Sequence, residues 1–459
     1  MKVQHHPLRS ARRIVILAFA AAVACSPADH GQAATTAQSP QNKEIPPATA
    51  HEISILEALL ANHPDDPAAL FNLAIDEATI GENAKALNLL EKMSQAHSGL
   101  DPAGGAFRAF KDIADDPRFV ALVAQIEKEN PPIVRSTTAL ILREPDLAPE
   151  GIAYDPVEKS FYLSSISKHK IVRIASDGTA KDFKSSQQDG LGATLGMKVD
   201  AKRRFLWVTS DLFEGDPKES RFALYQYDLN TGALRFKHLG AKGAEGFLND
   251  VALNSKGVAF TTNTTTGEAF RAYPDRDGLE PFLPRDAAGQ ANGIALSDDD
   301  KILFVAGWIG VARVDVATKQ GKLLAKPINI SDAGLDGMYF YKGSLVGIQN
   351  PDLHPSRVVR YFLNPRLDAI TREEVLETYN PLFEVPTTGT LVDDALFFMA
   401  NTHETSRPNA PRRRTERRPN LETEVLVTPI GKHLCGRRRE PRITPHEPRP
   451  NSTAPPSAA

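Results

Sequence analysis

Cysteine is scarce in this chain of 459 residues, because only Cys25 and Cys435 occur. At most one disulfide can form, and a cysteine-rich zinc site is excluded. The sequence also lacks a GxSxG nucleophile elbow, which disfavours a serine hydrolase built on an α/β sheet. It has no glycine-rich loop ending in Lys-Ser or Lys-Thr, so nucleotide hydrolysis has no support.

A strong charge of one sign is also missing, since the formal net charge is −3. With 41% hydrophobic and 24% charged residues the composition is that of an ordinary soluble protein, and the length favours roughly two to four domains. The last 56 residues hold 11 Arg and one Lys against six Glu, so the rest of the chain is acidic. An acidic body argues against nucleic acid as the main partner.

Residues 1–25 have the pattern of a signal peptide, with three arginines before an apolar run over residues 14–24. This run is too short to cross a roughly 30 Å hydrocarbon layer, and no later stretch is long enough. The segment AVAC, ending at Cys25, resembles a bacterial lipobox, in which the cysteine is lipidated, and cleavage after Ala33 is the alternative. Both interpretations predict an exported protein, either periplasmic or an outer-membrane lipoprotein of a bacterium, that meets a membrane only through a lipid anchor. Residues 26–50 are predicted to be a flexible linker.

Between residues 51 and 130 apolar residues recur at helical spacing, which predicts a small helical segment. The stretch ALFNLAIDEATIGENAKALNLLEKM resembles one tetratricopeptide repeat, with Ala74 and Ala86 where two helices press together. One repeat cannot bury its own apolar face, so we expect it to pack on its helical neighbours or on the next domain. A protein partner bound through this segment is a further expectation.

After residue 136 the chain repeats one pattern six times: an apolar strand, a polar turn and a second apolar strand. Between the first five copies the steps are 45, 54, 43 and 44 residues, the spacing of four-stranded propeller blades. The expected fold is therefore mainly β: a six-bladed β-propeller over residues 137–403, preceded by a small α-helical cap. The segment TTALIL in front of the first copy is expected to complete the last blade, because ring closure removes exposed strand edges. Residues 404–459, rich in Arg and Pro, are predicted to be a disordered tail, apart from a candidate strand at 423–427.

The openings of the repeats carry the candidate chemistry. In a propeller the loop that enters each innermost strand faces the central channel, so single residues from several blades converge. Four of the six openings hold side-chain oxygen donors, namely Glu150, Asn249, Asn292 and Asp336. Two carboxylates and two amides suit Ca²⁺, which takes six to eight oxygen ligands at about 2.3–2.6 Å. No paired histidines or thiolates are offered to a softer metal.

The set PEGIAYDP, NDVALNSKG, NGIALSDDDK and DGM resembles the senescence-marker-protein/gluconolactonase (regucalcin-like) superfamily, with its relatives diisopropylfluorophosphatase and the paraoxonases. The resemblance covers roughly residues 137–403. It implies a six-bladed propeller with a divalent metal, usually calcium, in the channel, and hydrolysis of lactones, esters or organophosphates. Glu150, Asn292 and Asp336 match the metal ligands of gluconolactonases.

Asn249 matches a position that is a ligand in diisopropylfluorophosphatase and paraoxonase but a substrate contact in gluconolactonases. The sequence departs from the pattern at two places. Gluconolactonases that act on sugars have an Arg two residues before this Asn, where this chain has Phe247, and paraoxonases have a second Asn where this chain has Gly337. An apolar lactone or ester is therefore favoured over a sugar lactone, with Asn249 and Phe247 as the expected substrate contacts.

The expected function is hydrolysis of a lactone or ester that depends on calcium or another divalent cation. Asp336 is the candidate catalytic residue, either as general base for water or as nucleophile. The alternative is a non-catalytic propeller that acts as a binding or scaffold protein of the cell envelope, with a structural metal. Propellers host many unrelated functions, so the fold alone does not choose between the two.

Overall fold

The computed structural model describes residues 45–104, 108–144, 147–212, 220–350, 355–401 and 423–430. The predicted signal peptide, Cys25 and most of the predicted linker and tail lie outside the described residues. Among the described helices, none combines the length and the apolar character that crossing a membrane requires.

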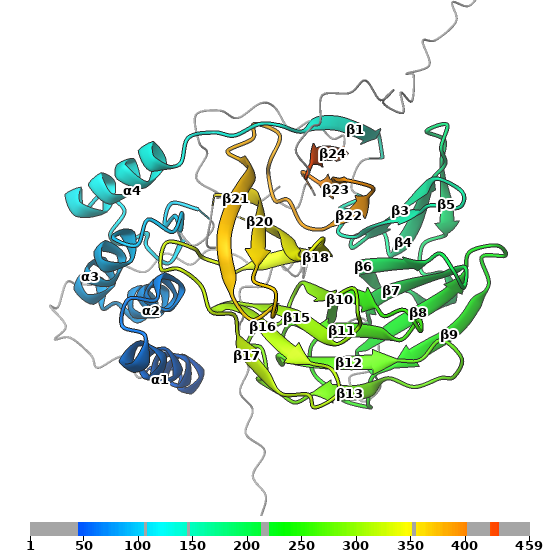
Figure 1. Ribbon diagram of the computed structural model, residues 1–459, viewed down its shortest axis with the longest axis horizontal. Helices are drawn as coiled ribbons and strands as arrows, with labels where there is room; N and C mark the ends of the chain where they lie inside the picture. The colour runs from blue at the N-terminus through cyan, green and yellow to red at the C-terminus, as the bar shows by residue number, and fades with distance from the viewer. Residues whose placement is uncertain are drawn as a thin grey trace, which may run out of the picture.

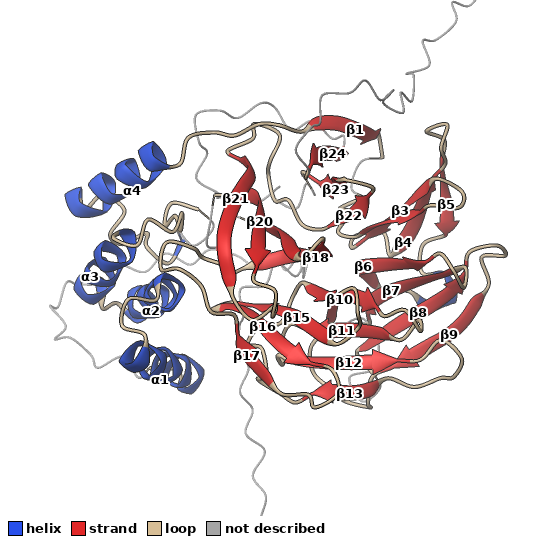
Figure 2. Cartoon of the chain, viewed as in Figure 1, coloured by secondary structure: helices blue, strands red, loops and turns tan. Residues whose placement is uncertain are grey.

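Six antiparallel sheets of four strands each form the blades of a propeller, as the sequence predicts (Figures 1 and 2). We number the blades 1 to 6 along the chain and give the strands of each from the inside outward. Blades 1 to 3 consist of β2 (Ile152–Asp155), β3 (Ser160–Ser165), β4 (Lys170–Ile174) and β5 (Ala180–Lys184); β6 (Ala193–Asp200), β7 (Phe205–Asp211), β8 (Phe222–Asp228) and β9 (Leu234–Leu239); and β10 (Leu248–Leu253), β11 (Ala259–Asn263), β12 (Glu268–Ala272) and β13 (Glu280–Leu283).

The other three blades close the ring. Blades 4 to 6 consist of β14 (Ile294–Leu296), β15 (Ile302–Gly307), β16 (Gly310–Asp315) and β17 (Gly321–Leu323); β18 (Leu335–Tyr341), β19 (Ser344–Gln349), β20 (Arg357–Leu363) and β21 (Ile370–Thr378); and β22 (Gly389–Val392), β23 (Ala395–Met399), β24 (Thr423–Pro429) and β1 (Thr137–Leu142). Each of the six predicted strand–turn–strand repeats is thus the inner pair of one blade.

Local chemistry explains why these pairs form. In blade 1 the polar turn between β2 and β3 is held by Asp155, whose Oδ1 accepts the N–H of Val157 at 3.0 Å. Both oxygens of the same carboxylate accept from Arg204 of blade 2, at 2.6 and 2.7 Å. This paired charge-assisted contact lowers the pKa of Asp155, against the effect of burial, and it fastens one blade to the next.

The strands of blade 6 show that the propeller extends beyond its predicted C-terminal boundary. The segment TTALIL forms β1, as expected, but it pairs with β24, which in turn pairs with β23. The propeller therefore runs from residue 137 to Pro429, and the predicted end at residue 403 is wrong. The prediction failed because the 23 residues between β23 and β24 break the repeat with an Arg- and Pro-rich insertion, so the lone apolar run beyond it was assigned to the tail.

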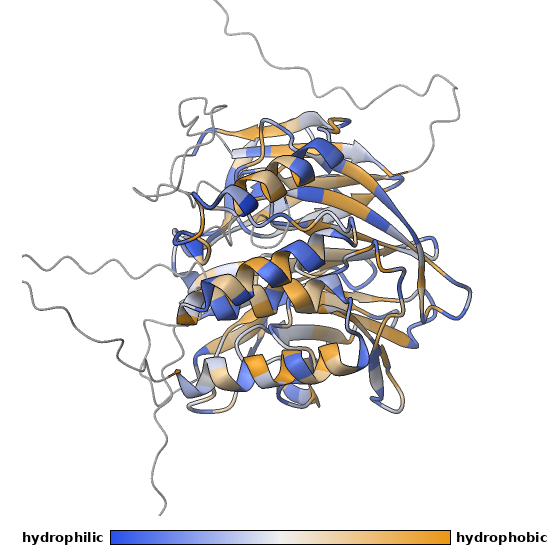
Figure 3. Cartoon of the chain, turned by 90° about the vertical axis from the view of Figure 1, so that its left-hand side faces the viewer, coloured by the Kyte–Doolittle hydropathy of each residue, from blue (hydrophilic) through white to orange (hydrophobic). Residues whose placement is uncertain are grey.

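Four helices precede the propeller: α1 (Pro47–Asn62), α2 (Pro67–Ile80), α3 (Asn83–Ser94) and α4 (Pro117–Glu129). The first begins inside the predicted linker, at Pro47 rather than at residue 51. Asp66 and Asp116 cap α2 and α4, because each side chain accepts a backbone N–H of the first turn. Ala74 and Ala86 are fully buried in one apolar cluster, as expected where α2 meets α3. Figure 3 shows the apolar and polar stripes that these helices carry.

The helices pack on blades 4 and 5, the side on which they lie in Figure 1. Trp308, in the turn between β15 and β16, joins the apolar cluster formed by α1 and α2, and its carbonyl oxygen accepts from Asn72 Nδ2 at 3.1 Å. Lys326 Nζ lies 2.8 Å from Asp332 and 3.7 Å from Asp66 of the α2 cap. The helical segment thus packs both within itself and on the next domain, the two surfaces that the sequence offered as alternatives.

These contacts lie at one particular edge of the propeller. Successive strands of a blade alternate in direction, so the second strand ends, the third begins and the fourth ends at the edge where the innermost strand starts. We call this edge the entry edge. Trp308 follows the second strand of blade 4, and Lys326 and Asp332 follow its fourth. The helices therefore pack at the entry edge, where the predicted site residues also lie.

Candidate functional site

The six segments that open the innermost strands form a continuous ring, which we call the entry ring. It consists of residues 150–151, 195–196, 249–250, 292–293, 336–337 and 387–388. Hydrogen bonds or close backbone approaches link each blade to the next at this ring, and they are described below from blade 1 back to blade 1.

Blades 1, 2 and 3 meet through backbone approaches that only glycine permits. A Cβ at Gly151 would overlap the carbonyl oxygen of Leu195, and a Cβ at Gly196 would lie 2.5 Å from the carbonyl oxygen of Asn249. The same Asn249 oxygen accepts a hydrogen bond from Thr209 Oγ1 of blade 2 at 2.9 Å. These contacts fix the position of Asn249 relative to blade 2.

Blades 3, 4 and 5 continue the ring in the same way. Thr262 Oγ1 of blade 3 donates to the carbonyl oxygen of Asn292 at 2.7 Å. A Cβ at Gly293 would overlap the carbonyl oxygen of Asp336. Asn292 and Asp336 are thereby held beside each other on neighbouring blades.

Hydrogen bonds through blade 6 close the ring. The N–H of Gly337 donates to the carbonyl oxygen of Thr387 at 3.2 Å. Thr387 and Thr388 then donate through their hydroxyls to the carbonyl oxygen of Glu150, at 3.0 and 2.5 Å. All four predicted ligand residues therefore lie on one ring about the propeller axis, although 186 positions separate the first from the last in the sequence.

Their side chains are largely withdrawn from solvent. Glu150, Asn249 and Asp336 are 7%, 6% and 5% exposed, and Asn292 is partly buried. The Oδ1 atoms of Asn249 and Asn292 are buried and have no hydrogen-bond partner among the described residues. A buried oxygen without a partner costs roughly 1–3 kcal/mol, so these two atoms call for a cation or a donor that the described residues do not supply.

Irregular strand starts help to aim these side chains. The pairing register shifts at the beginning of β6, β10 and β18, which are the innermost strands of blades 2, 3 and 5. Asn249 and Asp336 lie inside two of these irregular stretches. A β-bulge interrupts the alternation of a strand and can re-aim a side chain.

Two hydrogen bonds orient the groups in blade 5. Asn350, just after β19, donates from Nδ2 to Asp336 Oδ2 at 3.2 Å. The hydroxyl oxygen of Tyr339 accepts the N–H of Gly389 at 2.5 Å, which ties blade 5 to blade 6. The carboxylate of Asp336 is thus held in one orientation at the ring.

The phenol of Tyr339 lies within electrostatic range of three carboxylates. Burial raises its pKa well above the ordinary value, and the charges of Asp250, Asp336 and Glu150 raise it further. These carboxylates belong to blades 3, 5 and 1. Burial also raises the pKa of Asp250 to about 6, while Lys198 acts to lower it. The pKa of Lys198 itself is lowered by burial.

Three of these groups were not among the residues predicted from the sequence: Lys198, Asp250 and Tyr339. Each lies within an innermost strand, where core residues are expected. A signal was available for the first two, because a lysine in GMKVD and an aspartate in LNDVAL interrupt otherwise apolar strands. Tyr339 offers no such signal, since tyrosine is common in strands.

Two other residues were predicted to be functional, Phe247 and Cys25. Phe247 is buried immediately before β10, next to Asn249, and its carbonyl oxygen accepts the N–H of Thr264 at 3.3 Å. Its role as a substrate contact stays a prediction. Cys25, the predicted lipidation site, lies outside the described residues.

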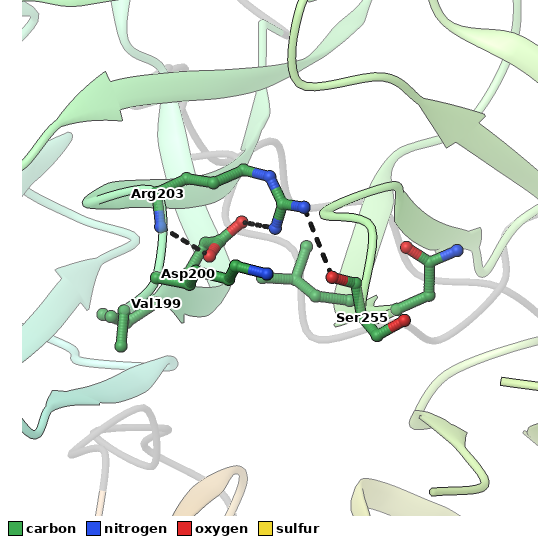
Figure 4. Close-up of a pocket in the computed structure, with 8 residues that line it drawn as sticks. Val199, Asp200, Arg203 and Ser255 are labelled. Carbon is green, nitrogen blue, oxygen red and sulfur yellow. Dashed lines mark hydrogen bonds and ion pairs between the residues drawn. The ribbon is translucent and has the colours of Figure 1, made fainter. Parts of the chain in front are cut away.

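We also searched the other described residues for a candidate metal site or pocket. Within the described ranges no group of three or more His, Cys, Asp or Glu side chains is placed to hold a metal ion, so a cation at the entry ring would need the amide oxygens too. A pocket between blades 2 and 3 lies at the edge opposite the entry edge (Figure 4). In it Arg203 pairs with Asp200 at 2.9 Å and donates to the carbonyl oxygen of Ser255 at 3.3 Å, so its charges satisfy one another.

The sequence matches no family model and no curated protein. Among solved structures, the chain is similar to a gluconolactonase from Xanthomonas campestris, with 14% identity and a TM-score of 0.44 over 65% of this chain and 97% of that one. A putative gluconolactonase has 15% identity and a TM-score of 0.43 over 65% and 91%. A PQQ-bound aldose sugar dehydrogenase from Streptomyces coelicolor has 14% identity and a TM-score of 0.43 over 65% and 99%.

Proposed function

We propose that this protein is a calcium-dependent hydrolase of a lactone or ester and that the entry ring is its active site. The observation that carries the proposal is the pair of buried amide oxygens, on Asn249 and Asn292, that lack a hydrogen-bond partner within the described part of the chain. They share a ring with the carboxylates of Glu150 and Asp336. An oxygen-only set of two carboxylates and two amides fits a hard divalent cation.

Glu150, Asn249, Asn292 and Asp336 would hold the cation. When bound, calcium supplies a Lewis acid that polarises the acyl carbonyl and offsets the negative charge developing on its oxygen. The protein contributes a rigid frame, because the neighbouring blades fix each of these residues through backbone contacts. Little reorganisation is then needed when the substrate reacts.

Asp336 has two chemical routes to hydrolysis. As a general base it takes a proton from water while the water oxygen bonds to the acyl carbon, and the proton passes to the alkoxide as the C–O bond breaks. As a nucleophile its oxygen bonds to the acyl carbon, the alkoxide leaves with a proton from water, and a second water cleaves the acyl-aspartate. In both routes the products are an acid and an alcohol, and Asn350 keeps the carboxylate oriented.

Phe247 supports an apolar substrate. It stands two residues before Asn249, where gluconolactonases that act on sugars have an arginine. A phenyl ring cannot donate hydrogen bonds to sugar hydroxyls, whereas it can pack against an alkyl or aryl group. The proposed substrates are therefore lactones or esters with an apolar substituent.

The test is a panel of alkyl lactones, sugar lactones, aryl esters and organophosphates, assayed with Ca²⁺ and after chelation. We expect turnover of an apolar lactone or ester that chelation removes, and a loss of at least about a hundredfold in kcat for Asp336→Asn, since a group acting in the transition state is removed. Asp298→Asn, at an exposed turn of blade 4, is the matched control and should retain full activity.

Equal rates for wild type and Asp336→Asn would contradict the proposed role of Asp336. Calcium binding without turnover of any class in the panel would instead favour a binding or scaffold protein of the cell envelope. In that case the helical segment would be the first surface to examine for a protein partner.

A further inference from the structure

The side-chain amide of Asn249 is held by a threonine beside the entry ring. Thr264 directly follows β11, the second strand of blade 3, and its backbone N–H donates to the carbonyl oxygen of Phe247 at 3.3 Å. Its hydroxyl oxygen accepts a hydrogen bond from Asn249 Nδ2 at 3.1 Å and donates to the carbonyl oxygen of Ala291 at 2.8 Å. Ala291 directly precedes Asn292, so one hydroxyl joins two neighbouring openings of the ring.

The number of protons on this hydroxyl decides the orientation of the amide. A threonine hydroxyl carries one proton, and a carbonyl oxygen can only accept, so the proton lies toward Ala291. The hydroxyl oxygen can then only accept from Asn249, which requires the NH₂ group of the amide to face it. The two ends of an amide have nearly the same shape, so their hydrogen-bond partners determine the orientation. The amide oxygen of Asn249 therefore points away from Thr264.

A second threonine of blade 3 makes a similar bridge without touching the amide. The hydroxyl of Thr262 donates to the carbonyl oxygen of Asn292 at 2.7 Å and accepts the backbone N–H of Asp250 at 3.3 Å. Both of these partners are backbone groups, so this bridge fixes the distance between blades 3 and 4. The bridge through Thr264 also acts on a side chain, and this contact gives it a second role.

That role concerns the oxygen at the other end of the amide. Asn249 Oδ1 is buried and has no hydrogen-bond partner among the described residues. A reversed amide would place two N–H donors where this oxygen lies, and donors repel a cation. It would also bring the amide oxygen against the hydroxyl oxygen of Thr264, whose proton is engaged by Ala291.

We propose that Thr264 is a positioning residue of the calcium site: its hydroxyl holds the NH₂ group of Asn249 and thereby keeps the amide oxygen available to the cation. This inference rests on the proposed calcium site. It concerns metal affinity, because partners that orient a ligand commonly contribute ten- to a hundredfold to the affinity for the metal.

The variant that tests this role is Thr264→Val, which replaces the hydroxyl by a methyl group of similar size. The amide of Asn249 is then free to turn, and we expect the Kd for Ca²⁺ to increase about tenfold or more. Thr264→Ser keeps the hydroxyl and should restore a Kd close to that of wild type. Thr261→Val is the matched control, because Thr261 is a fully buried residue of β11 whose hydroxyl has no partner among the described residues.

A double-mutant cycle distinguishes orientation of the amide from general support of the fold. In Asn249→Leu no amide remains to be oriented, so adding Thr264→Val should not increase the Kd further. A general loosening of the contact between blades 3 and 4 would instead weaken binding in both backgrounds. If Thr264→Val does not fold, Thr264→Cys serves the same cycle, since a thiol is only a weak donor and acceptor. The measurement is calorimetric titration of the chelator-treated protein with Ca²⁺.

The outcomes separate this inference from the proposed function. Equal Kd values for wild type and Thr264→Val would overturn the role of Thr264 and leave the calcium site standing. A weakening that persists in the Asn249→Leu background would also overturn that role. The expected pattern of Kd values without turnover of any lactone or ester would support the role of Thr264 and contradict the proposed hydrolase. No Ca²⁺ binding by wild type would overturn both.

Discussion

At the scale of single residues, the amide oxygens of Asn249 and Asn292 are costly in the absence of a ligand. A backbone or side-chain oxygen in a folded interior is normally paired, and each unpaired one reduces the free energy of unfolding. Evolution tolerates such a cost at sites where binding restores the missing interaction. The same atoms therefore make stability a direct readout of cation binding.

Replacing Asn292 by leucine should have opposite consequences with and without calcium. Without Ca²⁺ the melting temperature of Asn292→Leu should equal or exceed that of wild type, because an unpaired oxygen is removed. With Ca²⁺ at a hundred times the wild-type Kd, wild type should gain about 2.7 kcal/mol of stability, and the variant should lose most of that gain. Thermal unfolding with and without chelator measures both quantities.

Asn401 provides the matched control for this substitution. It is a buried asparagine of blade 6, but its Oδ1 already accepts the N–H of Glu424 at 2.9 Å. Asn401→Leu should therefore lower the melting temperature equally in both conditions. A Ca²⁺-induced increase that is as large in Asn292→Leu as in wild type would show that Asn292 is not a ligand.

The residues of the entry ring could be predicted because they break a local expectation. Turn-forming residues usually lie in the polar hairpin after a strand, yet Asn292 and Asp336 stand before one. Their shared register pointed to a common site. Lys198 and Tyr339 could not be assigned in this way. Lys198 Nζ lies 5.4 Å from the centre of the Tyr339 ring, and this contact depends on which blades face each other across the ring, a property of the closed propeller and not of any one repeat.

At the scale of elements, the two strands of each repeat could be predicted from the sequence. The third strand of blade 6 could be recognised as a candidate strand, but its place in the propeller could not. The inner pairs follow an alternation of apolar strands and polar turns that recurs along the chain. In the structure β24 lies between β23 and β1, and this position shows that an insertion separates β24 from β23 along the chain. Val425 and Leu426 of this strand are fully buried, so β24 contributes core packing to the closure of the ring.

Helix α2 carries a carboxyl group, that of Asp76, whose effect on the stability of the folded protein depends on pH. Asp76 lies near Glu52 and Glu77, and burial followed by these two charges raises its pKa to about 7. Its Oδ2 is buried without a hydrogen-bond partner in the described structure. The folded protein therefore keeps a proton on Asp76 at pH values where the unfolded chain, with an ordinary pKa of 3.8, has released it. Stability falls as the pH rises between these two values.

Asp76→Asn should remove this dependence. Its melting temperature relative to wild type should increase from pH 5 to pH 8, equivalent to about 1–2 kcal/mol after allowance for solvent screening of a partly exposed group. Thermal unfolding at the two pH values is the measurement, and Asp298→Asn, whose carboxylate is exposed, should show no such increase. A constant difference between Asp76→Asn and wild type across this range would contradict the assignment.

At the scale of the whole molecule, the helices and the propeller share an interface at the entry edge. Trp308 projects from blade 4 into the apolar cluster of α1 and α2, and Ala333 joins the larger helical cluster. The chain between them also contributes, because Ile133 forms a backbone bridge with Thr378 of β21. The sequence predicted that the helices need a partner surface, but which blades provide it depends on how the ring closes.

Because of this interface, we expect the helices and the propeller to unfold together in wild type. Trp308→Ala removes an aromatic side chain from this interface, at a cost of about 2–3 kcal/mol for a partly buried aromatic group. We expect the helical signal at 222 nm in circular dichroism to be lost at a lower temperature than the fluorescence of Trp207, which is then the chain's one remaining tryptophan and is fully buried in blade 2. In wild type the two transitions should coincide. The control is Ile328→Ala, which changes an exposed side chain in the loop between β17 and β18 and should leave the two transitions coincident. Coincident transitions in Trp308→Ala would contradict the prediction, because they would mean that the helices do not depend on this contact for their stability.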